Sequence, residues 1–148
     1  MQAYTLDVIL SAPRDAVFRF LADVEALPRW AAAFCERVDL VDGGWLALTG
    51  AGEVFCEVEA DDRTGVIDLR LAMGGEPPGL IPVRVLALPG GGTLVTLTLL
   101  RSPLQPAAQF HRLRQALQQD LQALGRRLRG EQVRAELSPA AEWAAAVV

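Results

Sequence analysis

The sequence predicts an α+β fold in which a strongly bent, antiparallel seven-stranded sheet surrounds one long C-terminal helix. Short alternating or β-branched runs, separated by turn residues, fill most of the first hundred residues. Nearer the C-terminus this pattern changes to an apolar period of 3.6 residues, which is typical of a helix. The chain has 148 residues, and a domain of that size buries about 68–70 % of its unfolded surface. A core that includes a cavity is therefore expected.

The N-terminal elements are expected to be a strand followed by two short helices. Apolar and more polar residues alternate over Tyr4–Leu10, which indicates a half-buried strand. Ser11–Pro13 ends this strand and begins a helix, with the proline in the first turn. Asp23 then caps a second short helix that contains Leu27 and Trp30.

Six further strands follow, because turn sequences recur at short intervals between the apolar runs. The connections are too short for parallel crossovers, so the strands form an antiparallel meander. The turns are expected at Asp42–Gly44, Thr49–Gly52, Asp62–Gly65, Gly74–Gly79 and Pro89–Gly92.

The last large element is an amphipathic helix. Apolar residues recur at spacings of three and four from Phe110 to Leu128, and arginine and glutamine fall on the opposite side. We assign residues 1–130 to the domain and 131–148 to a C-terminal extension. The extension either remains disordered or forms a short helix, with Ser138 as its cap, that docks through the segment around Trp143.

The hairpin registers decide which side chains share a face, since a slip of one residue inverts a strand. Pairing Leu88 with Thr93 sets Val83 opposite Thr98. A four-residue turn that ends with a left-handed Gly65 sets Val58 opposite Leu69, and centring the next loop on Glu76 sets Asp68 opposite Arg84.

The inner face, covered by the long helix, then carries Val54, Cys56, Val58, Ile67, Leu69, Leu71, Ile81, Val83, Val85, Leu94, Thr96, Thr98 and Leu100. The outer face carries Glu53, Glu57, Glu59, Asp68, Arg70, Arg84, Arg101, Leu86, Leu88, Val95 and Leu97.

Composition excludes several classes of function. The net charge of -4 argues against binding to a phosphate backbone, so no nucleic-acid partner is expected. All basic residues are arginine, and without lysine there is no Schiff-base chemistry. One histidine and two cysteines without a metal-binding spacing predict neither a metal site nor a cofactor. No signal peptide or membrane span is visible, so we expect a cytoplasmic protein.

The order of strand, two short helices, six strands and long helix is the helix-grip arrangement. The opening Ala12–Asp23, followed by Pro28-Arg29-Trp30, resembles the start of the SRPBCC superfamily, the START and birch-pollen-allergen-like group. Pro82–Val85, Thr96–Arg101 and the helix with Asp120–Leu124 are similar to an uncharacterised, polyketide cyclase/dehydrase-like branch. The resemblance implies the fold over about Tyr4 to Leu128. It implies no catalytic residue, since the family shares none.

Our first hypothesis is that a hydrophobic small molecule, lipid-like, polyketide-like or isoprenoid-like, binds between the sheet and the long helix. A bent sheet that one helix does not fill leaves a pocket, and such pockets are mostly apolar. The candidate ligand-binding residues are Trp30, Cys56, Val58, Leu69, Val83, Thr96, Thr98, Leu113, Arg114, Leu117 and Leu121. Several of them also have simpler roles: Trp30 in corner packing, Cys56 as a buried thiol, and Arg114 as a side chain lying along the helix–sheet boundary.

Two alternatives stay open. A cyclase or dehydratase would need acid–base groups in the pocket, and the weak candidates are Asp68, Arg84 and His111. Their simpler roles are an outward ion pair for Asp68 and Arg84, and a surface position for His111. A homodimer is the other alternative, because the predicted outer face carries an apolar patch of Leu86, Leu88, Val95 and Leu97.

Overall fold

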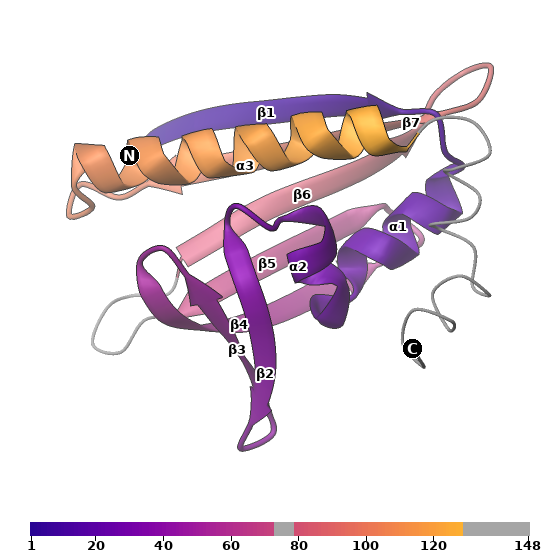
Figure 1. The fold of residues 1–148 in the computed structure, drawn as a ribbon. Coiled ribbons are helices and arrows are strands. Elements are labelled where there is room, and N and C mark those ends of the chain that lie inside the picture. Colours follow the sequence, from indigo (N-terminus) through magenta and orange to yellow (C-terminus); the bar gives the residue numbers. More distant parts are fainter. Residues whose placement is uncertain (73–78, 129–148) are drawn as a thin grey trace.

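The computed structural model describes residues 1–72 and 79–128, and these confirm the predicted α+β, helix-grip architecture (Figure 1). The elements, in chain order, are β1 (Gln2–Leu10), α1 (Arg14–Ala22), the 3-10 helix η1 (Val24–Ala26), α2 (Leu27–Trp30), β2 (Cys35–Val41), β3 (Gly44–Thr49), β4 (Gly52–Asp61), β5 (Val66–Ala72), β6 (Gly79–Ala87), β7 (Thr93–Arg101) and α3 (Ala107–Arg127).

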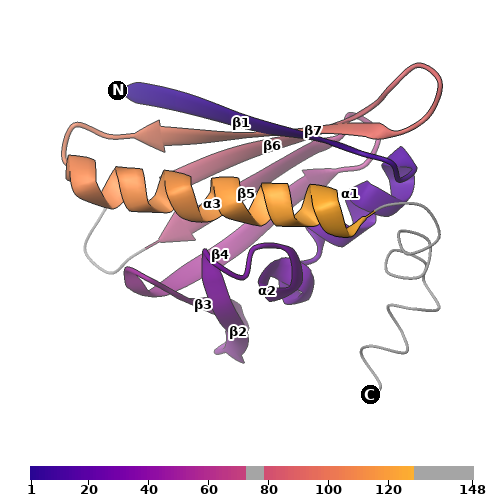
Figure 2. The ribbon, with the colours of Figure 1, turned by 45° about the horizontal axis from the view of Figure 1, so that its top comes forward.

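The seven strands form one antiparallel sheet in the order β1-β7-β6-β5-β4-β3-β2. Every pair except β1–β7 joins strands that are consecutive in the sequence, so β2 to β7 form the predicted meander. The sheet bends strongly, and all the helices lie on its concave side (Figures 1 and 2). The predicted loop over Gly74–Gly79 falls mostly outside the described residues, and so does the extension with Ser138 and Trp143.

Local residue chemistry explains the first connections. Pro13 takes the N-cap position of α1 instead of a place in its first turn, so the helix begins later in the chain than expected. Asp23 caps η1 by accepting a hydrogen bond from the Glu25 N–H at 3.0 Å. Gly65 has a positive φ of 74°, as predicted for the end of its turn. A side chain at this position would collide with the Val85 carbonyl oxygen, so the turn needs glycine here.

The core lies between the sheet and the helices. Helix α3 presents a buried stripe of Phe110, Leu117, Leu121 and Leu124 to the concave face. It packs against β1 most extensively, and Gly125 lets the helix approach Val8 closely.

The registers of the first strands confirm the predicted inner face. Val58 lies opposite Leu69, as expected. Between β5 and β6 the pairing differs from the predicted one by two residues, so that Asp68 faces Pro82 and Arg84 faces Val66. A shift of two keeps every side chain on its predicted face.

The predicted register of β7 is wrong by one residue. Ala87, not Leu88, pairs with Thr93, so Val83 lies opposite Leu97 instead of Thr98. The turn causes this difference. Three consecutive glycines with positive φ make Leu88 part of a five-residue loop, and the Leu88 N–H closes this loop by donating to the Gly92 carbonyl at 3.1 Å.

This shift inverts every side chain of β7. Thr93, Val95, Leu97 and Leu99 point inward and are buried. Leu94, Thr96, Thr98 and Leu100 point outward, contrary to the expectation for these four residues. The expected outer patch of Leu86, Leu88, Val95 and Leu97 therefore does not form, because Val95 and Leu97 are core residues.

Candidate ligand pocket

A cavity of about 1030 Å³ opens between the N-terminal half of α3 and the sheet. Its walls come from the segment before β2, the β3–β4 turn, the ends of β4 to β7, the loop after β7 and the first turns of α3. Its apolar side chains include Phe34, Val54, Leu71, Ile81, Leu99, Leu113 and Ala116.

The position of the cavity follows from what the short helices cover. Helix α1 packs near the far end of β6, where Arg14 forms an ion pair of 2.8 Å with Asp62 in the β4–β5 turn. Trp30 and its neighbours in η1 and α2 pack on the same half of the sheet and leave a void of only about 10 Å³. Among the described helices, α3 alone lies above the other half, with Leu71 and Ile81, and this half stays open.

The polar groups of the cavity are few and gather near one end of α3. Thr49 is already engaged, because its hydroxyl donates to the Gly52 carbonyl at 2.9 Å. Ser102, Gln105, Gln109 and Arg112 line the cavity from the β7–α3 loop and the first turns of α3. Within residues 1–72 and 79–128, no carboxylate, histidine or cysteine lines it.

The predicted ligand-binding residues divide into three groups in the structure. Leu113 lines the cavity, and Leu117 and Leu121 are fully buried on the same helix without lining it. The residues on the other half of the sheet border the small void under η1 and α2 instead: Trp30, Val58, Leu69 and Val83. The remaining ones do not line the cavity: Cys56, Thr96, Thr98 and Arg114.

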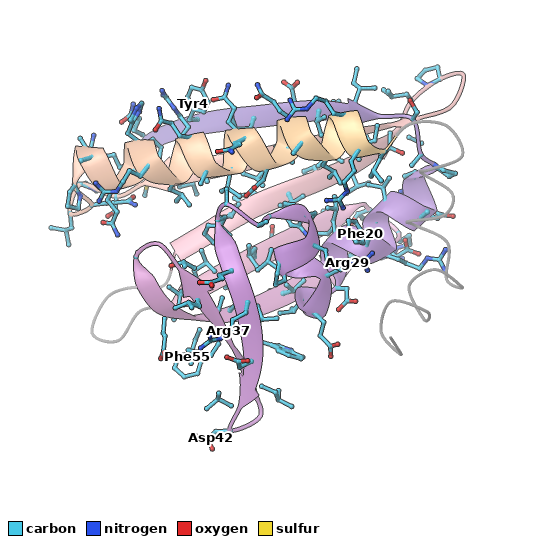
Figure 3. All side chains as sticks on the ribbon, in the orientation of Figure 1. Tyr4, Phe20, Arg29, Arg37, Asp42 and Phe55 are labelled. Carbon is cyan, nitrogen blue, oxygen red and sulfur yellow. The ribbon has the colours of Figure 1, made fainter. Side chains whose placement is uncertain are left out.

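The residues of this last group have other environments, and Thr96, like Thr98, points outward from β7. Cys56 is buried on the inner face, and burial raises the pKa of its thiol to about 12, so it is not a ready nucleophile. The Thr98 hydroxyl lies 2.9 Å from that of Thr5 on the outer face. The Arg114 guanidinium lies 4.4 Å from the centre of the ring of Tyr4, a β1 residue that Figure 3 labels.

The weak catalytic candidates lie away from the cavity. Asp68 and Arg84 form an ion pair of 2.9 Å on the outer face, with side chains 23 % and 40 % exposed. His111 is exposed on α3, and its Nδ1 lies 3.5 Å from Arg114 Nη2. The described lining therefore brings no general acid or base to a ligand.

Sequence reasoning missed Leu99 and Arg112 as lining residues. The predicted β7 register puts Leu99 on the outer face, and the helical pattern puts Arg112 on the side of α3 opposite the apolar stripe. The spacing of α3 holds a signal, because Arg112 lies three residues after Gln109 and four residues before Ala116, and both of these line the cavity.

The described part of the chain offers no group of three or more side chains suited to hold a metal ion. None of its helices is both long enough and apolar enough to cross a membrane.

Comparison with solved structures identifies the fold. The di-domain ARO/CYC BexL from the BE-7585A biosynthetic pathway superposes with a TM-score of 0.68 at 19 % identity, over 94 % of this chain and 48 % of that one. The Aha1 dimer from Colwellia psychrerythraea gives 0.65 at 14 % identity, over 86 % and 96 %. A START superfamily protein from Mycobacterium smegmatis gives 0.55 at 16 % identity, over 82 % and 98 %.

The chain has the helix-grip fold of these proteins. The resemblance drawn from the opening Ala12–Asp23 is thus confirmed at the level of the fold. No protein-family model and no curated protein matches the sequence.

Proposed function

We propose that the protein binds a hydrophobic small molecule in the cavity beneath the N-terminal half of α3. The cavity carries this proposal: its volume of about 1030 Å³ is at the upper end of the range typical of small-molecule sites, and its walls are predominantly apolar. The fold shared with a START superfamily protein and with an ARO/CYC protein supports the same class of function.

Acid–base catalysis has less support. The cyclase or dehydratase hypothesis needs a titratable group within hydrogen-bond reach of the ligand. Asp68 and Arg84 pair with each other on the outer face instead. The likeness to BexL, at 19 % identity, concerns the fold and transfers no catalytic residue.

Two residues of the predicted dimer patch, Val95 and Leu97, are buried, but a different apolar patch lies on the outer face. Ile9, Leu94 and Leu86 lie directly opposite one another across β1, β7 and β6, and Ile9 and Leu86 are 66 % and 48 % exposed. One of the structures with this fold is described as a dimer. Sedimentation across a concentration series tests this hypothesis separately from ligand binding.

Filling the cavity tests the binding proposal. The substitution Leu113→Trp places a bulky ring in the cavity, so it should weaken binding of the uncharged apolar fluorophore N-phenyl-1-naphthylamine at least about tenfold, or about 1.4 kcal/mol. The readout is fluorescence enhancement of the probe, excited away from tryptophan absorption. Circular dichroism establishes that the variant is folded.

The matched control is Leu86→Trp, the same substitution at a half-exposed position of the outer face. It should leave probe binding unchanged. Unaltered binding in folded Leu113→Trp, or equal losses in both variants, would count against the cavity as the binding site.

A further inference from the structure

The cavity is polar at one end of α3 and apolar further along. Positions 109, 112, 113 and 116 of α3 recur at helical spacing and line it from one side, and Gln105 lines it from the loop just before the helix. The polar side chains of this row, Gln105, Gln109 and Arg112, come before Leu113 and Ala116, although Pro106 and Ala108 also line the cavity near the start of the helix. A ligand lying along α3 therefore meets the amide and guanidinium side chains of this row toward the start of the helix.

Arg112 is the charged side chain of this polar end. It is the single charged residue among those described around the cavity, and the described parts of the chain give it neither an ion pair nor a hydrogen bond. The neighbouring arginines are occupied: Arg101 Nε donates to the Gln105 carbonyl at 3.1 Å, and Arg114 lies over Tyr4. Nothing in the described ranges therefore occupies the guanidinium of Arg112, which can meet a ligand.

The local charge favours an anion. A guanidinium presents several N–H donors in a plane that matches a carboxylate or a phosphate. No described carboxylate lines the cavity to compete for it. The amide side chains of Gln105 and Gln109 lie on the same side and can donate further hydrogen bonds.

We propose that the ligand is a single-tailed acidic amphiphile, with a carboxylate or phosphate head at Arg112 and an apolar body against Leu113 and Ala116. On the sheet side this body would face Leu71, Ile81 and Leu99. The inference rests on the proposed function, and it adds the chemical class of the ligand and its orientation in the cavity.

The test compares two probes on the full chain, 11-(dansylamino)undecanoic acid and its methyl ester, which differ in charge and by the methyl group of the ester. Because Arg112 is exposed to solvent, screening limits the gain, and the acid should bind about threefold to tenfold more tightly than the ester. The difference should shrink as sodium chloride is raised, whereas ester binding should not weaken. Displacement of the probe by dodecanoic acid and by dodecyl phosphate then distinguishes the two kinds of head.

Three variants assign the preference to one side chain. Arg112→Gln should abolish the preference, so that the acid and the ester bind this variant with equal affinity. Arg112→Lys should keep part of the preference, because the charge remains. Arg126→Gln, an exposed arginine of the same helix outside the cavity, should keep all of it.

Equal affinity of acid and ester for the unaltered protein, or a preference that survives in Arg112→Gln, would overturn this inference while the proposed function stands. Failure of both dansyl probes and of N-phenyl-1-naphthylamine to bind would overturn the two together.

Discussion

Asp120 is a carboxylate on the otherwise apolar buried stripe of α3 and is only 6 % exposed. Its two oxygens accept hydrogen bonds from the backbone N–H groups of Ala33, at 2.8 Å, and Phe34, at 3.0 Å. These contacts tie α3 to the segment before β2, which forms one wall of the cavity. Burial raises the pKa of this carboxyl group, and the two hydrogen bonds offset part of that rise.

Replacing this carboxylate should destabilise the fold. In Asp120→Asn one of the two N–H groups faces an amide that cannot accept from it, so we expect a loss of about 1–3 kcal/mol in the free energy of unfolding. Asp120→Ala leaves both donors unpaired and should cost more. Urea denaturation followed by circular dichroism measures both losses, and an unchanged midpoint would contradict this role.

The loss of unfolding free energy in Asp120→Asn should also depend on pH. Because the pKa of Asp120 is raised in the folded state, the fold binds more protons here than the unfolded chain does, at pH values just above the usual aspartate pKa of 3.8. The advantage of the unaltered protein over Asp120→Asn should therefore shrink as the pH rises through this range. An advantage that grows with pH would mean that hydrogen bonding outweighs burial.

At the scale of elements, the β6–β7 hairpin decides which side chains of β7 reach the core. Leu97 is 1 % exposed on the inner face, and Leu100 is 36 % exposed on the outer face. In the register expected from the sequence these two positions are reversed. The two leucines therefore form a matched pair for testing the strand register.

Leu97→Ala should lower the free energy of unfolding by about 2–5 kcal/mol, because it removes methyl groups from a packed core. Leu100→Ala should lower it by less than about 1 kcal/mol, because the side chain is already partly hydrated. Chemical denaturation of both variants provides the measurement. A larger loss for Leu100→Ala would favour the register that places Thr98 inside.

The contrast between β4 and β7 shows how far sequence periodicity reaches. In β4 glutamates at 53, 57 and 59 alternate with apolar residues, so the pattern excludes the inverted register. In β7 both faces carry leucine or valine, and threonine occurs on each, so the pattern fits either register. The conformation of the three glycines then determines the register of β7, and this conformation cannot be predicted from composition.

At the scale of the whole molecule, the cavity results from unequal coverage of one bent sheet. Helix α3 spans the concave side, and α1, η1 and α2 fill only the half that holds Leu69 and Val83 (Figure 2). The sequence predicted the inner face of β4 to β6 and the long helix above it, but not the inner face of β7. It did not show which half the short helices cover, since that depends on the bend of the sheet. The predicted lining residues consequently fall mainly in the filled half.

The measurement that tests the central claim most directly is an NMR titration of uniformly ¹⁵N-labelled protein with N-phenyl-1-naphthylamine. If the ligand lies beneath the N-terminal half of α3, the largest amide shift changes should cluster at Leu71, Ile81, Leu99 and Leu113. Val58, which borders the small void under η1 and α2, and Leu86 should remain nearly unmoved. Changes centred on either of those two residues would place the ligand in the filled half of the core or on the outer face, and would contradict the account.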